Sequence, residues 1–197
     1  MRIAVVLVLS ALGFIAEVSA ATKVDKRAPV IRRTAKLSAV EEAQQKFTFA
    51  GRPIHPKAVH LLLGNLADSQ PVVVAVDVGA AATSNDYLAD GVEVEQDVVR
   101  YSNDTESVGY VRLGTLTNGV VVLRAWESGG GSGVFESLLC VRFERFAGRP
   151  GQKGERLIMR TAGIASLGDR TDEKVQLLPD RVIVGKPGTK EVRVLRF

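Results

Sequence analysis

Residues 108–127 have the sequence VGYVRLGTLTNGVVVLRAWE, two strand-like runs on either side of Asn118-Gly119. Valine and aromatic residues favour strands. An Asn-Gly pair between two such runs indicates a β-hairpin, because a type I′ turn needs a positive φ at both of its central residues. With a two-residue loop, the register places Val111 opposite Trp126. The segment therefore predicts a pair of adjacent antiparallel strands.

Strand patterns also occupy most of the chain around this hairpin. They cover residues 71–78, 92–101, 134–146, 156–165, 175–178, 181–184 and 191–197. The strands are short, turn-rich segments separate them, and no helical pattern lies between them, which favours an antiparallel fold over an α/β sheet. We predict an all-β protein, an antiparallel, jelly-roll-like β-sandwich of roughly nine strands.

Two short helices are expected before the strands. Ser38 and Glu41 have the spacing of a capping box, which predicts a helix that ends near Lys46. Pro56 is a favoured first helical residue, and leucine and valine follow it at helical spacing. The sandwich is therefore expected to carry one or two short N-terminal helices.

The first 20 residues have the pattern of a secretory signal peptide. Arg2 supplies the positive charge, residues 3–15 are apolar, and Val18-Ser19-Ala20 is a small-residue cleavage site. An uncleaved membrane anchor is the alternative, but the apolar run is shorter than the roughly 18–20 residues that span a bilayer. We expect export to the periplasm or outside the cell, and no transmembrane segment after cleavage.

The net charge of +4 is concentrated near the N-terminus. Residues 21–46 hold seven basic and three acidic side chains, whereas residues 47–197 hold 18 of each. This distribution does not support a nucleic-acid surface. We therefore expect a signal peptide (1–20), a basic flexible arm with a short capped helix (21–46) and a β-sandwich domain (47–197). The arm is either a solvated linker or a contact with an anionic envelope surface.

Metal, cofactor and catalytic signatures are weak. Cys140 is the only cysteine, so no intrachain disulfide or thiolate metal cluster can form. His55 and His60 are the only histidines, and their spacing turns them about 140° apart on a helix. We expect no metal and no cofactor. The chain has no Gly-x-Ser-x-Gly motif, and we expect that it is not an enzyme.

Candidate ligand-binding residues lie at strand ends, where sandwiches often carry function. Asn85, Asp86 and Tyr87 form an oxygen-rich segment that can hold a sugar hydroxyl or calcium, or can form only a turn. Trp126, beside Glu127, is either a stacking platform for a sugar or a core residue against Val111 and Val122.

The glycine-rich stretch 129–133 includes Ser132 and resembles a phosphate-binding loop in composition only. A strand pattern follows it, whereas a phosphate site needs a helix N-terminus there. We therefore interpret it as a hairpin loop that allows close approach of a ligand or partner.

Together these features predict a non-catalytic secreted or periplasmic module that binds a glycan or an envelope protein through strand-end loops. Two alternatives remain: a small secreted hydrolase that uses carboxylates of the acidic segment 68–136, and a structural envelope protein.

The signal-peptide hypothesis predicts where the exported protein begins. Mass spectrometry of protein exported by its native host should find Ala21 at the N-terminus, because the small-residue site ends at Ala20. Recovery of the chain from Met1 in a membrane fraction would contradict export by cleavage.

Overall fold

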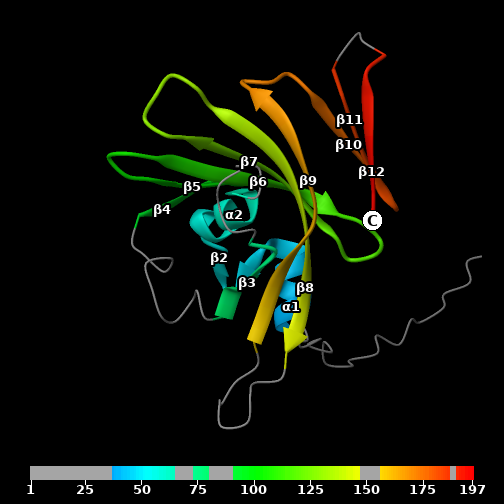
Figure 1. The fold of residues 1–197 in the computed structure, drawn as a ribbon. Helices are drawn as coiled ribbons and strands as arrows, with labels where there is room; N and C mark the ends of the chain where they lie inside the picture. Colours follow the sequence, from blue (N-terminus) through cyan, green and yellow to red (C-terminus); the bar gives the residue numbers. More distant parts are fainter. Residues whose placement is uncertain (1–36, 65–72, 80–90, 147–155, 187–189) are drawn as a thin grey trace, which may run out of the picture. The chain divides into compact units, whose positions relative to one another are not determined.

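The computed structural model describes residues 37–64, 73–79, 91–146, 156–186 and 190–197 (Figure 1). These residues form two helices, α1 (Ala39–Lys46) and α2 (Pro56–Leu63). The strands are β1 (Thr48–Phe49), β2 (Arg52–Pro53), β3 (Ala75–Asp77), β4 (Val92–Glu95), β5 (Val98–Ser102), β6 (Ser107–Thr115), β7 (Val121–Ser128), β8 (Phe135–Phe146), β9 (Arg156–Asp169), β10 (Lys174–Leu178), β11 (Arg181–Gly185) and β12 (Val192–Arg196). Neither helix is long and apolar enough to span a bilayer.

The strands form antiparallel sheets, which confirms the predicted all-β sandwich-like fold. The large sheet has the order β3-β9-β8-β7-β6-β5-β4, so β4 to β9 follow one another as a meander. This meander differs from a jelly roll, in which successive strands pass between two sheets. A smaller sheet has the order β10-β11-β12. The single strand expected over 92–101 is a hairpin of β4 and β5, which turns at Gln96 with a φ of 56°.

The two faces of the large sheet belong to two separate hydrophobic cores. On β7, Val121 and Leu123 contribute to one core, while Val120, just before the strand, and Val122 contribute to the other. All four are 0% exposed. Alternate residues of a strand point to opposite faces, so β7 is covered on both sides.

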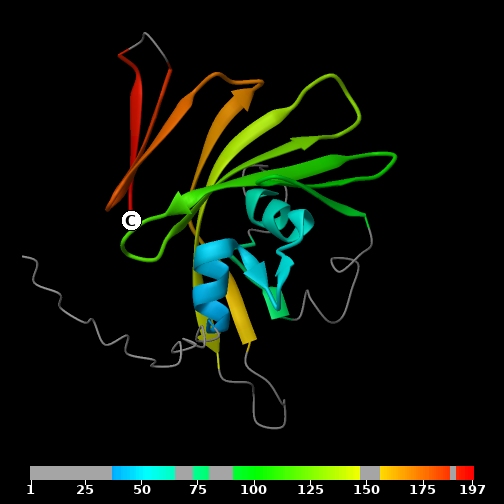
Figure 2. The ribbon, with the colours of Figure 1, turned by 180° about the vertical axis from the view of Figure 1, so that it is seen from behind.

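Both helices cover one face of the large sheet (Figure 2). Ala43 of α1 and Leu62 of α2 are fully buried in the same core as Leu123. Phe47, at the C-terminal end of α1, packs edge-on against Tyr110 and Phe143, with ring centroids 5.1 and 5.7 Å away.

The predicted capping box begins α1. The Ser38 hydroxyl accepts the amide proton of Glu41 at 3.3 Å, and the Glu41 carboxylate accepts that of Ser38 at 2.8 Å. The sequence places this helix in a flexible arm. Instead it is part of the compact unit Lys36–Phe197, because its apolar side contacts the sheet.

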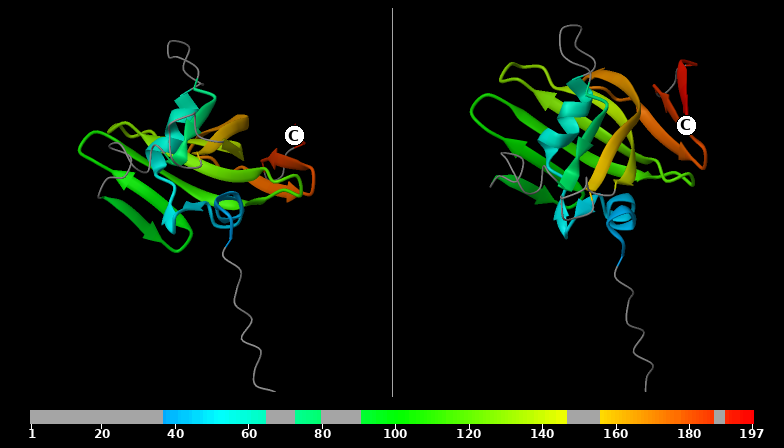
Figure 3. Two further views of the ribbon diagram at one scale, coloured as in Figure 1. Left: turned by 90° about the horizontal axis from the view of Figure 1, so that it is seen from below. Right: turned by 60° about the horizontal axis from the view of Figure 1, so that its bottom comes forward.

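The small sheet packs against the other face of the large sheet (Figure 3). Val182 and Val184 of β11 share a core with Val122 and Cys140. Burial raises the pKa of the Cys140 thiol to about 12, so this cysteine behaves as a small apolar residue, as the sequence predicted.

The central hairpin forms with a register that differs from the sequence prediction. Its loop has three residues, because the Leu116 amide donates to the Val120 carbonyl at 2.8 Å and only Gly119 has a positive φ, of 81°. A bulge between Arg112 and Gly114 shifts the pairing by one more residue. Trp126 therefore lies opposite Gly109, and the predicted pairing with Val111 is wrong.

Contacts outside the hairpin explain the longer loop. Both the amide and the hydroxyl of Thr117 donate to the Pro179 carbonyl, at 3.0 and 2.7 Å. These bonds hold Thr117 in the loop, next to the β10–β11 turn, rather than in a cross-strand pair. The sequence around Asn118 does not contain this information.

Candidate functional site

The indole of Trp126 lies over Gly109 on the neighbouring strand. A Cβ atom placed on Gly109 would meet the indole ring at 2.2 Å, so only glycine leaves room for it. Gly109 is buried, whereas Trp126 is only partly buried and belongs to neither hydrophobic core. The interpretation of Trp126 as a core residue against Val111 and Val122 is therefore wrong.

Charged side chains flank the indole along a row that crosses five strands. Cross-strand pairing places Arg100 beside Gly109, and Glu136 beside Trp126, on the same face of the sheet. Glu93 follows Arg100 at the edge and forms an ion pair with it at 2.6 Å. Glu136 accepts a hydrogen bond from Arg124 Nε at 2.5 Å.

The next row of the same face carries hydroxyl groups. Ser102 pairs with Ser107, and Ser107 pairs with Ser128, so three serines cross β5, β6 and β7 side by side. The Ser102 and Ser107 hydroxyls are 2.8 Å apart. We call the surface formed by Glu93, Arg100, Ser102, Ser107, Gly109, Arg124, Trp126, Ser128 and Glu136 the tryptophan face.

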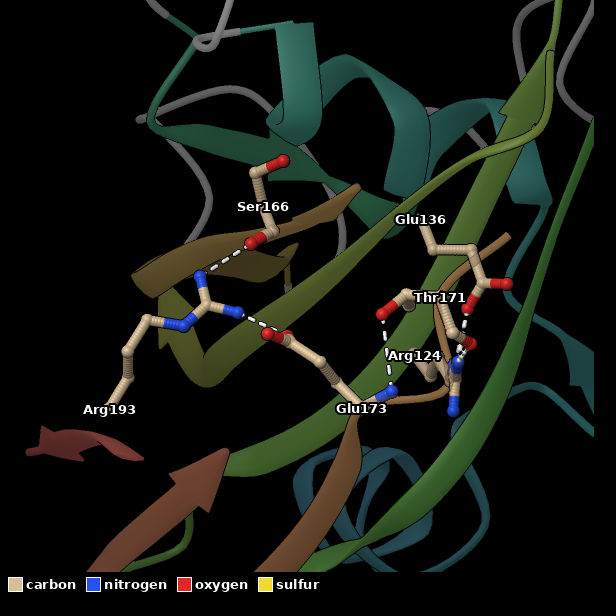
Figure 4. A network of polar contacts seen from close by, with 6 residues as sticks. All are labelled: Arg124, Glu136, Ser166, Thr171, Glu173 and Arg193. Carbon is tan, nitrogen blue, oxygen red and sulfur yellow. Dashed lines mark hydrogen bonds and ion pairs between the residues drawn. The ribbon is translucent and has the colours of Figure 1, made fainter. Parts of the chain in front are cut away.

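A polar network fixes the border between the tryptophan face and the small sheet (Figure 4). Arg124 donates to the Thr171 carbonyl at 3.1 Å, and Arg193 of β12 donates to the Ser166 carbonyl at 2.5 Å. Arg193 also forms an ion pair with Glu173. The Arg124 bond attaches the connection between β9 and β10 to the large sheet, and the Arg193 contacts attach β12 to β9 and to the same connection.

The structure describes three of the six ligand-binding residues selected from the sequence, namely Trp126, Glu127 and Ser132. Asn85, Asp86 and Tyr87 lie outside the described residues. Ser132 is exposed in the β7–β8 loop, where its carbonyl accepts a hydrogen bond from Arg170. Glu127 follows Trp126 on β7 and therefore lies on the opposite face, in contact with α2.

Sequence reasoning missed the neighbours of Trp126. Gly109, Arg100 and Glu136 come from three different strands, and only the true register brings them to the indole. A glycine in the middle of a strand was the available signal, because it often marks close approach of another group.

Glu127 instead belongs to a charged cluster under α2. Its carboxylate lies 2.9 Å from His60 Nδ1, and Lys57 forms an ion pair with Glu106 at 2.7 Å. Glu127 raises the pKa of His60, and His60 lowers the pKa of Glu127, chiefly through their contact. His55 has another role: its Nδ1 accepts the Lys57 amide proton and caps α2.

Within the ranges that the structure describes, no three of the histidine, cysteine and carboxylate side chains are grouped as a metal site. Comparisons of the chain with models of protein families, with curated proteins and with solved structures found no match. Any functional conclusion for this chain must therefore come from the geometry of its own residues.

The His60–Glu127 contact predicts a pH-dependent contribution to stability. The raised pKa of His60 means that this contribution is fully present below the unfolded pKa of about 6.5 and is lost as pH rises through the folded pKa. Relative to Glu127→Gln, the wild type should gain at most about 1 kcal/mol near pH 6, because both side chains are partly exposed, and nothing near pH 9.

NMR titration of the imidazole measures the same contact directly. The pKa of His60 should fall in Glu127→Gln and fall less in Glu106→Gln, since Glu106 acts on it only through its charge. Equal pKa values in Glu127→Gln and the wild type would contradict the ion pair.

Proposed function

We propose that this protein is a non-catalytic module that binds a glycan at the tryptophan face. The observation that carries the proposal is a partly exposed indole held over Gly109 and bordered by charged groups and hydroxyls. An indole ring packs well against the apolar face of a sugar ring. The surrounding side chains supply the hydrogen bonds that a sugar's hydroxyl groups need.

The polar border supports a glycan over a protein partner. Arg100 and Arg124 donate, Glu93 and Glu136 accept, and the serine hydroxyls do both. These groups already pair with one another, so they are positioned before a ligand arrives. The centres of protein interfaces are depleted of glutamate and serine, whereas both residue types border this indole. A carbohydrate suits such a surface better.

The arrangement of the site on a sheet face supports a chain-like ligand. The row from Glu93 to Glu136 crosses five strands, and neighbouring strands are about 5 Å apart. The row is therefore longer than one sugar ring is wide. We propose an oligosaccharide or polysaccharide of the cell envelope or the outside medium as the ligand, which agrees with the proposed export of the chain. Nothing in the described residues favours the hydrolase or the structural alternative.

The proposal predicts that Trp126 dominates glycan binding. On an array of soluble neutral and acidic polysaccharides, the wild type should bind one class, Trp126→Ala should bind at least about tenfold more weakly, and Trp126→Phe should fall between them because it keeps a smaller ring. Phe135→Ala is the matched control, since Phe135 is an exposed aromatic residue of the same sheet that pairs with Glu127 on the other face.

Three results would count against this function. If the folded wild type binds no polysaccharide, the glycan hypothesis is wrong. If it instead binds a protein partner, and this binding depends on Trp126, the protein-binding alternative replaces it. Equal affinities of Trp126→Ala and Phe135→Ala would show that the glycan binds elsewhere.

A further inference from the structure

A second surface, on the helix-covered face of the large sheet, is hollowed into a pocket of about 330 Å³. It lies between the C-terminal end of α1, strands β1 and β2, and the β4–β5 hairpin. Small-molecule pockets usually have about 300–1,000 Å³, so this one is of a size for one or two rings. The pocket shares no residue with the tryptophan face.

Part of the pocket wall is apolar and rigid, and polar side chains form the rest of its lining. Phe47, Val99 and Tyr110 line it, and all three side chains are buried in the hydrophobic core. The Tyr110 hydroxyl donates to the Ile54 carbonyl at 2.6 Å, so its polar atom is already satisfied. The ring is buried in the core and offers no free polar atom to a ligand.

The charged groups at the pocket favour an anion. Arg112 and Lys46 line it together with a single carboxylate, Asp97, which leaves an excess of one positive charge. Asp97 stabilises the charge of Arg112 at a distance, and no carboxylate of the described residues forms an ion pair with Arg112.

The Arg112 guanidinium is also held in place. Its Nη2 atom donates to the Gln44 carbonyl at 3.0 Å and to the Thr115 hydroxyl at 2.8 Å. Its buried Nε atom has no hydrogen-bond partner among the described residues. Burial lowers the pKa of Arg112 because it removes water from the charge, and a bound anion would offset that cost.

We propose that this pocket binds a small organic anion, with a body of one or two rings against the exposed side chain of Val94 and a carboxylate or sulfonate directed to Arg112 and Lys46. The apolar part of the wall contributes affinity, and the two cations give selectivity for the negative charge. A neutral molecule of the same shape leaves both cations without a new partner and binds more weakly.

A pair of fluorescent probes tests this selectivity on the full chain. Naphthalene-2-sulfonate and naphthalene-2-sulfonamide have the same two-ring body, but only the first is anionic at neutral pH. The sulfonate should bind one to one and at least about tenfold more tightly than the neutral probe, because one charge-assisted hydrogen bond contributes about that much. Equal affinities would overturn the proposal, and so would a lack of saturable binding.

Matched variants locate the probe. Val94→Trp should abolish sulfonate binding by filling the pocket, because Val94 lines it and is exposed on the edge strand β4. Val192→Trp is the control, since Val192 is equally exposed on β12, which belongs to the other sheet. The proposal fails if Val94→Trp binds like Val192→Trp.

Lys46→Gln and Arg112→Gln separate charge from shape. Each should weaken the sulfonate severalfold and leave the neutral probe unchanged, because only the sulfonate uses the charge. Arg112→Gln also loses its bonds to Gln44 and Thr115, so circular dichroism must show that this variant folds. If it does not fold, Lys46→Gln alone decides the test, because Lys46 is exposed. Unchanged sulfonate affinity in Lys46→Gln and in folded Arg112→Gln would refute anion recognition.

Discussion

Burial of β7 and β8 on both faces is the constraint on which the rest of the structure depends. An antiparallel sheet commonly has one face in water, but Val121 to Leu123 and Leu138 to Val141 are all 0% exposed. Both faces must then be covered by other parts of the chain. The two helices cover one face and the small sheet covers the other, so two cores form on either side of the same strands.

The tryptophan face exists because the small sheet covers only part of its face of the large sheet. The core under the small sheet reaches Val122 and Leu138, but it does not extend to Trp126. From Arg124 onward, β7 carries charged or partly exposed residues on this face, and the bonds of Arg124 to Glu136 and Thr171 mark the boundary. Trp126 lies just beyond the edge of this core and stays partly exposed, and for this reason we propose it as the ligand contact.

Local sequence signals predicted the elements well. The valine-rich runs, the capping box of Ser38 and Glu41, and Pro56 at the start of α2 all form as expected. They succeed because each depends on neighbouring residues of the chain. The sequence grouped α1 with the basic residues 21–46, and the burial of Ala43 could not be read from it because that burial depends on distant strands.

The candidate site was predictable only in part, for the same physical reason. Trp126 was identified from its residue type, but its neighbours depend on a register set by the Thr117–Pro179 bonds and by the bulge at Arg112. A shift of two residues in pairing keeps the same faces and changes every partner. The glycine under the indole, and the arginine and glutamate beside it, follow from that register.

Native-state hydrogen exchange tests the central claim, burial of the central strands on both faces, most directly. The amides of Val121 to Leu123 and Leu138 to Val141 should exchange only through global unfolding, with free energies equal to the full stability of the protein. Those of the edge strand β4 should exchange at clearly lower free energies, because it pairs on one side only. Exchange of the β7 amides as fast as those of β4 would contradict a sheet covered on both faces.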